Sequence, residues 1–395
     1  MNKRIYLDHA ATTYVRAEVL EEMSPFFASI YGNPSSIHSF GREARKAVET
    51  AREQVAKALN AQPNEIFFTS GGTEANNWAL KGIAAANKAK GNHIITSMIE
   101  HHAVLHTCEN LEKKGFEVTY LPVDDNGLLT AEQVKAAITD KTILISIMSA
   151  NNEIGTLQPI EEIGKVAADN GIYFHTDAVQ SIGSVKLDVK AMNIDALSLS
   201  AHKFYGPKGV GALYLKKGVK TDNLFHGGAQ EKNRRAGTEN ISGIVGLGKA
   251  IELADANITQ YAQRMESLRD MMIKGIMDKV KFVRLNGHHT KRLPGNANLS
   301  FEFIEGESLL LSLDMKGIAA SSGSACTSGS LDPSHVLLAI GLSHEIAHGS
   351  LRLTFGDTNT EQDVEYVLNV LPGIVNRLRD MSPLFAQREE GPSYV

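Results

Sequence analysis

Short apolar runs alternate with amphipathic helical stretches over the first 260 residues. Apolar side chains recur at helical spacing between Arg42 and Asn60, and again after Pro159, where the stripe stops at Asn170 and Gly171. Runs with the length of buried strands lie at residues 66–68, 94–95, 118–121, 143–148, 173–174, 196–199 and 211–215. This alternation predicts an α/β fold with a mostly parallel, mixed sheet.

The pattern changes near residue 260. A long charged helix is predicted over residues 261–279, and strands and helices follow it in a looser order. A chain of 395 residues is long enough for more than one hydrophobic core. We therefore expect a large domain over residues 15–260, and a smaller α+β domain built from residues 1–14 and 261–395.

Composition narrows the class of protein. Hydrophobic residues make up 43% of the chain and charged residues 22%, with a formal net charge of −5. This is the composition of a soluble globular protein, and without a basic stripe or a long apolar run we expect neither nucleic-acid nor membrane partners. Two cysteines cannot build a disulfide framework and show no zinc-type spacing, so a reduced cytoplasm is the expected compartment.

Three motifs carry candidate chemistry at the ends of predicted strands. The run from Thr69 to Glu74 would open a helix with outward backbone N–H groups that suit a phosphate, although a plain glycine turn remains open. This run has neither the residue spacing of a Walker A loop nor that of a dinucleotide-binding motif. Asp177 follows the strand at residues 173–174, where an acid either contacts a ligand or caps a helix. Lys203 follows the next strand, where a lysine either forms a Schiff base or extends its amine to solvent. A phosphate cup, a lysine and an acid together suggest pyridoxal phosphate (PLP).

The two cysteines lie in different surroundings. Cys326 occurs in a run, residues 319–330, that is otherwise made only of Ala, Ser, Gly and Thr. Such a run suits a thiol that must move and react, although it also fits a flexible surface loop. Cys108 lies in a helical stretch with apolar neighbours, so we expect it to be a small core residue.

These motifs belong to a longer series in chain order. The series consists of Tyr6-Leu7-Asp8, Ala11-Thr12-Thr13, Gly32-Asn33-Pro34-Ser35-Ser36, Thr69 to Glu74, Glu100-His101, Asn151-Asn152-Glu153-Ile154-Gly155, His175 to Gln180, Ser200 to Lys203, Arg234-Arg235-Ala236-Gly237-Thr238, Ser324-Ala325-Cys326 and Arg352. In this series the chain resembles the cysteine desulfurases of the NifS/IscS type, and its cysteine segment is most similar to the NifS-like branch. They are class V, PLP-dependent enzymes with the fold type I of aspartate aminotransferase. One departure is His9-Ala10, where many members have Asn-Asn.

The resemblance implies a role for each site residue. Lys203 would carry PLP and move the proton at the substrate Cα, Asp177 would pair with the pyridine nitrogen, and His101 would stack on the ring. The phosphate would be held by Gly72, Thr73, Ser200 and His202, with Thr238 reaching in from a second subunit of a homodimer. Gln180 and Asn152 would contact the cofactor's phenolic oxygen and the substrate. Asn33 would also bind the substrate, and Arg352 would hold its carboxylate.

The implied reaction converts L-cysteine to L-alanine. Cys326, on a mobile loop of the small domain at about residues 321–334, would take the sulfur as a persulfide. It would then deliver the sulfur to an acceptor such as an iron–sulfur scaffold protein. Cys326 could also ligate an iron–sulfur cluster transiently together with that scaffold, and no other metal ligand is assigned.

Other functions remain open from the sequence. With the same cofactor, the chain could be an aminotransferase, which has no need of Cys326, or a lyase specific for selenocysteine. It could instead be a catalytically idle scaffold for iron–sulfur assembly, against which the intact Lys203, Asp177 and His101 argue. A nucleotide-binding α/β protein is disfavoured, because the nucleotide motifs are missing.

Overall fold

A computed structural model describes residues 4–322, 333–383 and 385. In this part of the chain a seven-stranded sheet has the order β2-β8-β7-β6-β5-β3-β4. Its strands are β2 (Ile66–Thr69), β3 (His93–Ser97), β4 (Glu117–Leu121), β5 (Thr142–Ser146), β6 (Tyr173–Asp177), β7 (Ala196–Ser200) and β8 (Gly211–Leu215). Only β8 runs against its neighbours, β2 and β7, so the predicted α/β fold with a mostly parallel, mixed sheet is confirmed.

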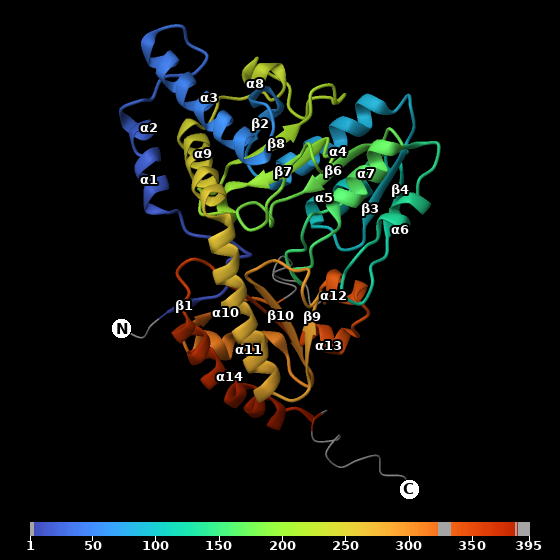
Figure 1. Ribbon diagram of the computed structural model, residues 1–395, viewed down its shortest axis with the longest axis vertical. Coiled ribbons are helices and arrows are strands. Elements are labelled where there is room, and N and C mark those ends of the chain that lie inside the picture. The colour runs from blue at the N-terminus through green and yellow to red at the C-terminus, as the bar shows by residue number, and fades with distance from the viewer. Residues whose placement is uncertain (1–3, 323–332, 384, 386–395) are drawn as a thin grey trace.

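Helices cover both faces of this sheet (Figure 1). They are α1 (Ala17–Met23), α2 (Pro25–Ala28), α3 (Ser39–Leu59), α4 (Gly72–Asn87), α5 (His102–Glu112), α6 (Ala131–Ala136), α7 (Ile160–Asp169), α8 (Gln230–Asn233) and α9 (Ile241–Ala256). Side chains alternate between faces along each strand. Phe68 and Ile95 therefore enter the core with α3, α7 and α9, whereas Phe67 and Ile94 enter the core with Trp78 of α4.

A second core lies in the lower part of Figure 1. It is built on the antiparallel sheet β12-β10-β9, and the chain's first strand pairs in parallel with β11 nearby. The strands are β1 (Ile5–Tyr6), β9 (Val283–Asn286), β10 (Asn296–Phe301), β11 (Ile318–Ala319) and β12 (Ser350–Thr354), and the helices are α10 (Ile258–Lys279), α11 (Gly306–Asp314), α12 (His335–Ala339), α13 (His344–His348) and α14 (Glu361–Asp380). Ile5 and Leu7 are buried in this core, which supports the proposed two-domain division.

The expected elements are present, and some bounds move. The helices expected over residues 42–60 and 261–279 are α3 and α10, and the helix after Pro159 is α7, which ends at a cap on Asn170. Strand β6 runs to Asp177, which is its last residue, so the expectation that this acid follows a shorter strand was wrong. Cys108 is fully buried beside Trp78 and Val104, as expected for a core residue.

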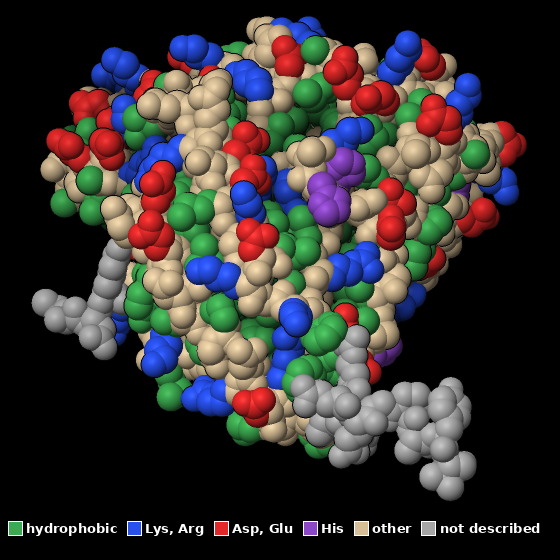
Figure 2. All heavy atoms as spheres, turned by 60° about the horizontal axis from the view of Figure 1, so that its bottom comes forward, with side chains coloured by type: hydrophobic (Ala, Val, Ile, Leu, Met, Phe, Trp, Pro, Cys, Tyr) green, Lys and Arg blue, Asp and Glu red, His purple; other side chains and the backbone are tan. Residues whose placement is uncertain are grey.

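The surface in Figure 2 interleaves charges of both signs. Lys and Arg side chains lie between Asp and Glu side chains, and no single sign dominates that face. In the described ranges, none of the helices combines the length and the apolar character that a membrane span requires.

Candidate active site

Three sheet strands end at the same edge, where the predicted site residues lie. Strands β6 and β7 are parallel, and β2 has the same direction, because both β2 and β7 run against β8. Asp177 ends β6, Ser200 ends β7, and Thr69 ends β2 just before α4 begins. Open α/β sheets bind ligands at this carboxyl edge.

A cavity of about 360 Å³ opens at the start of α4. It is lined by Thr12, Ser70, Gly71, Gly72, Thr73, Glu74, Ser200, His202, Lys208 and Gly209. A Cβ on Gly72 would lie 2.6 Å from the side chain of Val179, so only glycine allows the helix to start this close to the segment after Asp177. The first N–H groups of a helix have no partner within the helix. With the hydroxyls and Lys208 around them, they fit a phosphate group.

Lys203 lies on a single 3₁₀ turn, residues Ala201–Lys203, directly after β7. Its Nζ donates to the carbonyl oxygens of Ala10 and Ala11. Gln180 Nε2 also donates to Ala10 O, at 3.1 Å, so the lysine and the glutamine converge on one carbonyl. The neighbouring His202 has its Nδ1 3.1 Å from Thr12 Oγ1 and lines the phosphate cavity. The lysine is therefore anchored next to the cavity.

Asp177 presents a buried carboxylate between β6 and α4. Its Oδ2 accepts from Asn76 Nδ2 at 2.6 Å, and its Oδ1 accepts from the backbone N–H of Val179 at 3.0 Å. An ionised carboxylate has about four acceptor positions, so capacity remains for one further donor. The protonated ring nitrogen of PLP is a donor that fits this remaining acceptor position.

His101 caps the start of α5 and faces both charged groups. Its Nδ1 accepts from the backbone N–H of Ala103 at 3.0 Å, so the neutral ring carries its hydrogen on Nε2. Burial lowers the pKa of His101, Asp177 opposes this effect, and Lys203 adds to it. The side chain is thus a neutral ring that can stack on a cofactor and offer one N–H.

Arg352 lies in the middle of β12, with its side chain only 2% exposed. Its two Nη atoms donate to Asp8 Oδ1 at 3.0 Å and to Asn152 O at 3.1 Å. Its Nε is buried and has no hydrogen-bond partner among the described residues. A buried N–H without a partner is costly, and an anionic ligand group would satisfy it.

Three predicted site residues stand apart from this cluster. Asn33 accepts from Ser35 N at 2.9 Å within its own turn and does not line the cavity. Thr238 is exposed and is also absent from the lining. Cys326 and most of its loop lie outside the described residues.

The structure adds residues to which no role was given from the sequence. Asn76 holds Asp177, and Thr13 accepts from Tyr205 N while its Oγ1 donates to His202 O. Glu153 is buried and accepts from Ser334 Oγ, and burial raises its pKa to about 7. Thr13 and Glu153 belong to the motifs Ala11-Thr12-Thr13 and Asn151 to Gly155, which gave these side chains no role, and no motif in the sequence signalled Asn76.

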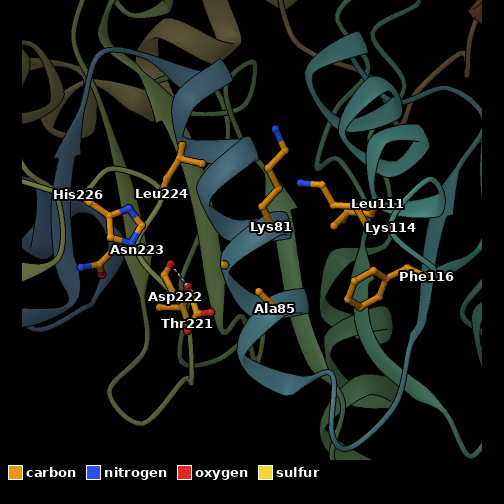
Figure 3. A pocket seen from close by; sticks show the side chains of 11 residues that line it. Lys81, Ala85, Leu111, Lys114, Phe116, Thr221, Asp222, Asn223, Leu224 and His226 are labelled. Carbon is orange, nitrogen blue, oxygen red and sulfur yellow. Dashed lines mark hydrogen bonds between the residues drawn. The ribbon is translucent and has the colours of Figure 1, made fainter.

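Another cavity, of about 540 Å³, lies along the far half of α4 (Figure 3). Lys81 and Lys114 stand on one side of it, and Asp222, Asn223 and His226 on the other. None of the predicted site residues lines it. In the described residues, no group of three or more His, Cys, Asp or Glu side chains could hold a metal ion.

Comparisons with known proteins agree with this geometry. The aminotransferase class-V family matches residues 5–367. A cysteine desulfurase IscS of Clostridium botulinum is 64% identical over 98% of both chains, and one of Methanosarcina thermophila is 62% identical over 97% of this chain and 95% of its own. A solved NifS-like protein aligns with a TM-score of 0.90 and 41% identity, covering 95% of this chain and all of that one. A structure titled SspA in complex with cysteine aligns with a TM-score of 0.80 and 41% identity, covering 89% of this chain and 99% of that one.

The family and the site chemistry point to the same cofactor. The cradle at α4, the anchored lysine and the buried acid fit the phosphate, the aldehyde and the ring nitrogen of PLP. The chain belongs to the class-V aminotransferase family and, within it, to the PLP-dependent cysteine desulfurases of the IscS and NifS type.

Proposed function

We propose that the chain removes sulfur from L-cysteine, releases L-alanine and passes the sulfur to an acceptor through Cys326. The observation that carries the proposal is the convergence of Lys203, Asp177 and His101 beside the cradle of α4. The curated relatives with 62% and 64% identity bear the name cysteine desulfurase, which supports the same reaction.

In this proposal each residue of the sheet edge has one task. Gly72, Thr73, Ser200 and His202 hold the cofactor phosphate, and Asp177 keeps the ring nitrogen protonated. When bound, PLP supplies an aldehyde that joins amines and a ring that withdraws electrons from the substrate Cα. Lys203 Nζ takes the Cα proton and returns it, and His101 stacks on the ring. Gln180 and Asn152 bind polar groups of cofactor and substrate.

Arg352 holds the substrate carboxylate. Its Nε has no hydrogen-bond partner among the described residues, and a carboxylate can use it together with one Nη in a fork. Asp8 fixes the other end of the guanidinium at 3.0 Å, which keeps the side chain in one orientation.

Cys326 takes the sulfur in this scheme. Its thiolate attacks the substrate sulfur, so that an S–S bond forms while the Cβ–S bond breaks and Cβ takes a proton. Cysteine and thiol therefore give alanine and persulfide with no outside oxidant.

The described chain approaches the site on both sides of this segment. Ser321 pairs with Arg352 through two backbone hydrogen bonds, and Ser334 bonds to Glu153.

Three further parts of the proposal concern partners and location. The chain forms a homodimer in which Thr238, exposed on one subunit, reaches the cofactor phosphate of the other, and Asn33 binds the substrate. The sulfur acceptor is an iron–sulfur scaffold protein, with which Cys326 can ligate a cluster transiently. A reduced cytoplasm suits a free thiol and a persulfide that must react with other thiols.

The proposal is tested with purified protein, L-cysteine and a reductant. Alanine and sulfide are expected in equal amounts, because each turnover breaks one Cβ–S bond. Selenocysteine is assayed in parallel. Alanine and selenide formed only from selenocysteine would reassign the protein as a selenocysteine lyase, and amino-group transfer without sulfide would make it an aminotransferase.

Replacement of Arg352 by alanine should weaken cysteine binding. A hydrogen bond to a charged group contributes about 1.5–3 kcal/mol, so we expect KM for cysteine to rise by about 10- to 100-fold. Arg352→Lys keeps the charge but loses the fork, and should recover only part of the effect. Steady-state kinetics on protein with intact PLP absorbance measures this, with Arg284→Ala on β9 as the exposed control. An unchanged KM in Arg352→Ala would rule out the carboxylate role.

A further inference from the structure

Three consecutive residues of α8 have a left-handed backbone, although none is glycine. Glu231, Lys232 and Asn233 have φ values of 45°, 58° and 63°. We call residues 231–233 the left-handed turn. L-residues are disfavoured in this region, and such conformations persist only where the surrounding structure imposes them. The turn therefore needs a cause outside its own sequence.

A buried ion pair provides that cause. Arg52 of α3 and Glu231 are both 3% exposed, and two Nη atoms of the arginine donate to the two carboxylate oxygens at 2.8 Å. The same carboxylate accepts from the backbone N–H of Phe68 in β2 at 3.0 Å. The Arg52 guanidinium also lies over the Phe68 ring, 4.8 Å from its centroid. Glu231 is thus fixed to a central helix and to a strand that leads into the phosphate cradle.

The chain beyond the turn returns to that cradle. Arg235 forms a fork with Glu74 in the first turn of α4, with Nε–Oε1 at 2.9 Å and Nη2–Oε2 at 3.1 Å. Glu74 Oε2 also accepts from the backbone N–H of Ser70 at 2.8 Å. Ser70 and Glu74 both line the cavity. The arginine therefore ties the segment 234–238, with the exposed Thr238 at its end, to the wall of the cavity.

We propose that Arg52 and Glu231 are positioning residues for the cofactor-phosphate end of the site. Their ion pair holds the left-handed turn, the turn directs Arg235 onto Glu74, and that fork fixes both this chain's cradle and the segment that presents Thr238. The inference rests on the proposed function, because it assumes that PLP phosphate occupies the cradle.

The test measures PLP affinity separately from folding. Arg52→Met/Glu231→Leu replaces the pair by apolar side chains of similar volume, a change that buried ion pairs often tolerate. We expect the Kd for PLP, measured by absorbance on reconstitution, to rise about tenfold, while the melting temperature of the PLP-free protein changes little. Arg269→Met, at a buried arginine paired with Asp270 in the small domain, is the control and should leave the Kd unchanged.

Arg235→Met keeps the inference testable if the double variant does not fold, and a glycine variant of the turn tests the mechanism if it does. Arg235→Met, at a half-buried position, removes only the fork and should raise the Kd by a similar factor, without adding to the effect of the double variant. Lys232→Gly/Asn233→Gly in the double variant should recover part of the affinity, because glycine accepts positive φ. A folded Arg235→Met protein with the wild-type Kd would overturn the inference. Wild-type protein that binds no PLP would instead overturn the proposed cofactor site.

Discussion

A Lys203→Ala variant is expected to fold and to lose the visible absorbance that PLP has when it is joined to a lysine. Lys203 lies on the turn after β7, and its Nζ is held by the carbonyls of Ala10 and Ala11 beside the cavity. In the proposed mechanism, alanine removes both the covalent attachment of PLP and the group that moves the Cα proton. General acid–base groups contribute about 10²–10⁴-fold, so turnover should fall by at least that factor.

Absorbance spectra and cysteine turnover of the purified variant test this expectation. Lys216→Ala is the control, because Lys216 is 51% exposed, pairs with Asp195 and should have no part in the reaction. The phosphate cradle is intact in Lys203→Ala, so PLP can still bind without a bond to the protein. A variant that keeps the wild-type spectrum would show that another amine carries the cofactor.

A Cys326→Ala variant should keep the wild-type visible spectrum and lose sulfide release. In the proposed mechanism the Cys326 thiolate is the nucleophile that receives the sulfur, and removal of a catalytic nucleophile can cost about 10³-fold or more. The same proposal gives the binding of PLP and of cysteine to Lys203, Asp177 and Arg352, which the substitution leaves unchanged. The expected phenotype is therefore a coloured protein that binds cysteine and does not turn it over.

The chain's other cysteine is the matched control. Cys108 is fully buried in the core beside α4, and burial raises the pKa of its thiol far above the usual range. Cys108→Ala should cost about 1–2 kcal/mol of stability through the small cavity it leaves, with sulfide release preserved. Equal activity of Cys326→Ala and wild type would remove Cys326 from the mechanism and favour the aminotransferase reading.

Much of the sheet and its chemical edge could be predicted from local sequence. Each apolar run lies on a strand of the large sheet, and all of these strands except β8 point the same way, so the residues after those strands meet at one edge. Asp177, Lys203 and the start of α4 lie at or just after the ends of three such strands, so their proximity could be predicted from the sequence. The same local signal misjudged the end of β6, because the polar residues His175 and Thr176 are buried in hydrogen-bonded strand positions.

Contacts between distant segments could not be predicted in this way. Arg352 meets Asp8 across 344 residues, and Arg52 meets Glu231 across 179. The left-handed turn has the sequence Glu-Lys-Asn, which carries no glycine to signal it, because its cause is a partner on α3. Tertiary contacts, not local propensity, decide these features.

Peptide mass spectrometry of the wild-type protein after brief exposure to L-cysteine, without reductant, tests the central claim most directly. We expect the added mass of one sulfur atom on the peptide that contains Cys326, with unmodified Cys108 and an equivalent amount of alanine in solution. Alanine and sulfide formed while Cys326 stays unmodified, or a persulfide on Cys108, would contradict it.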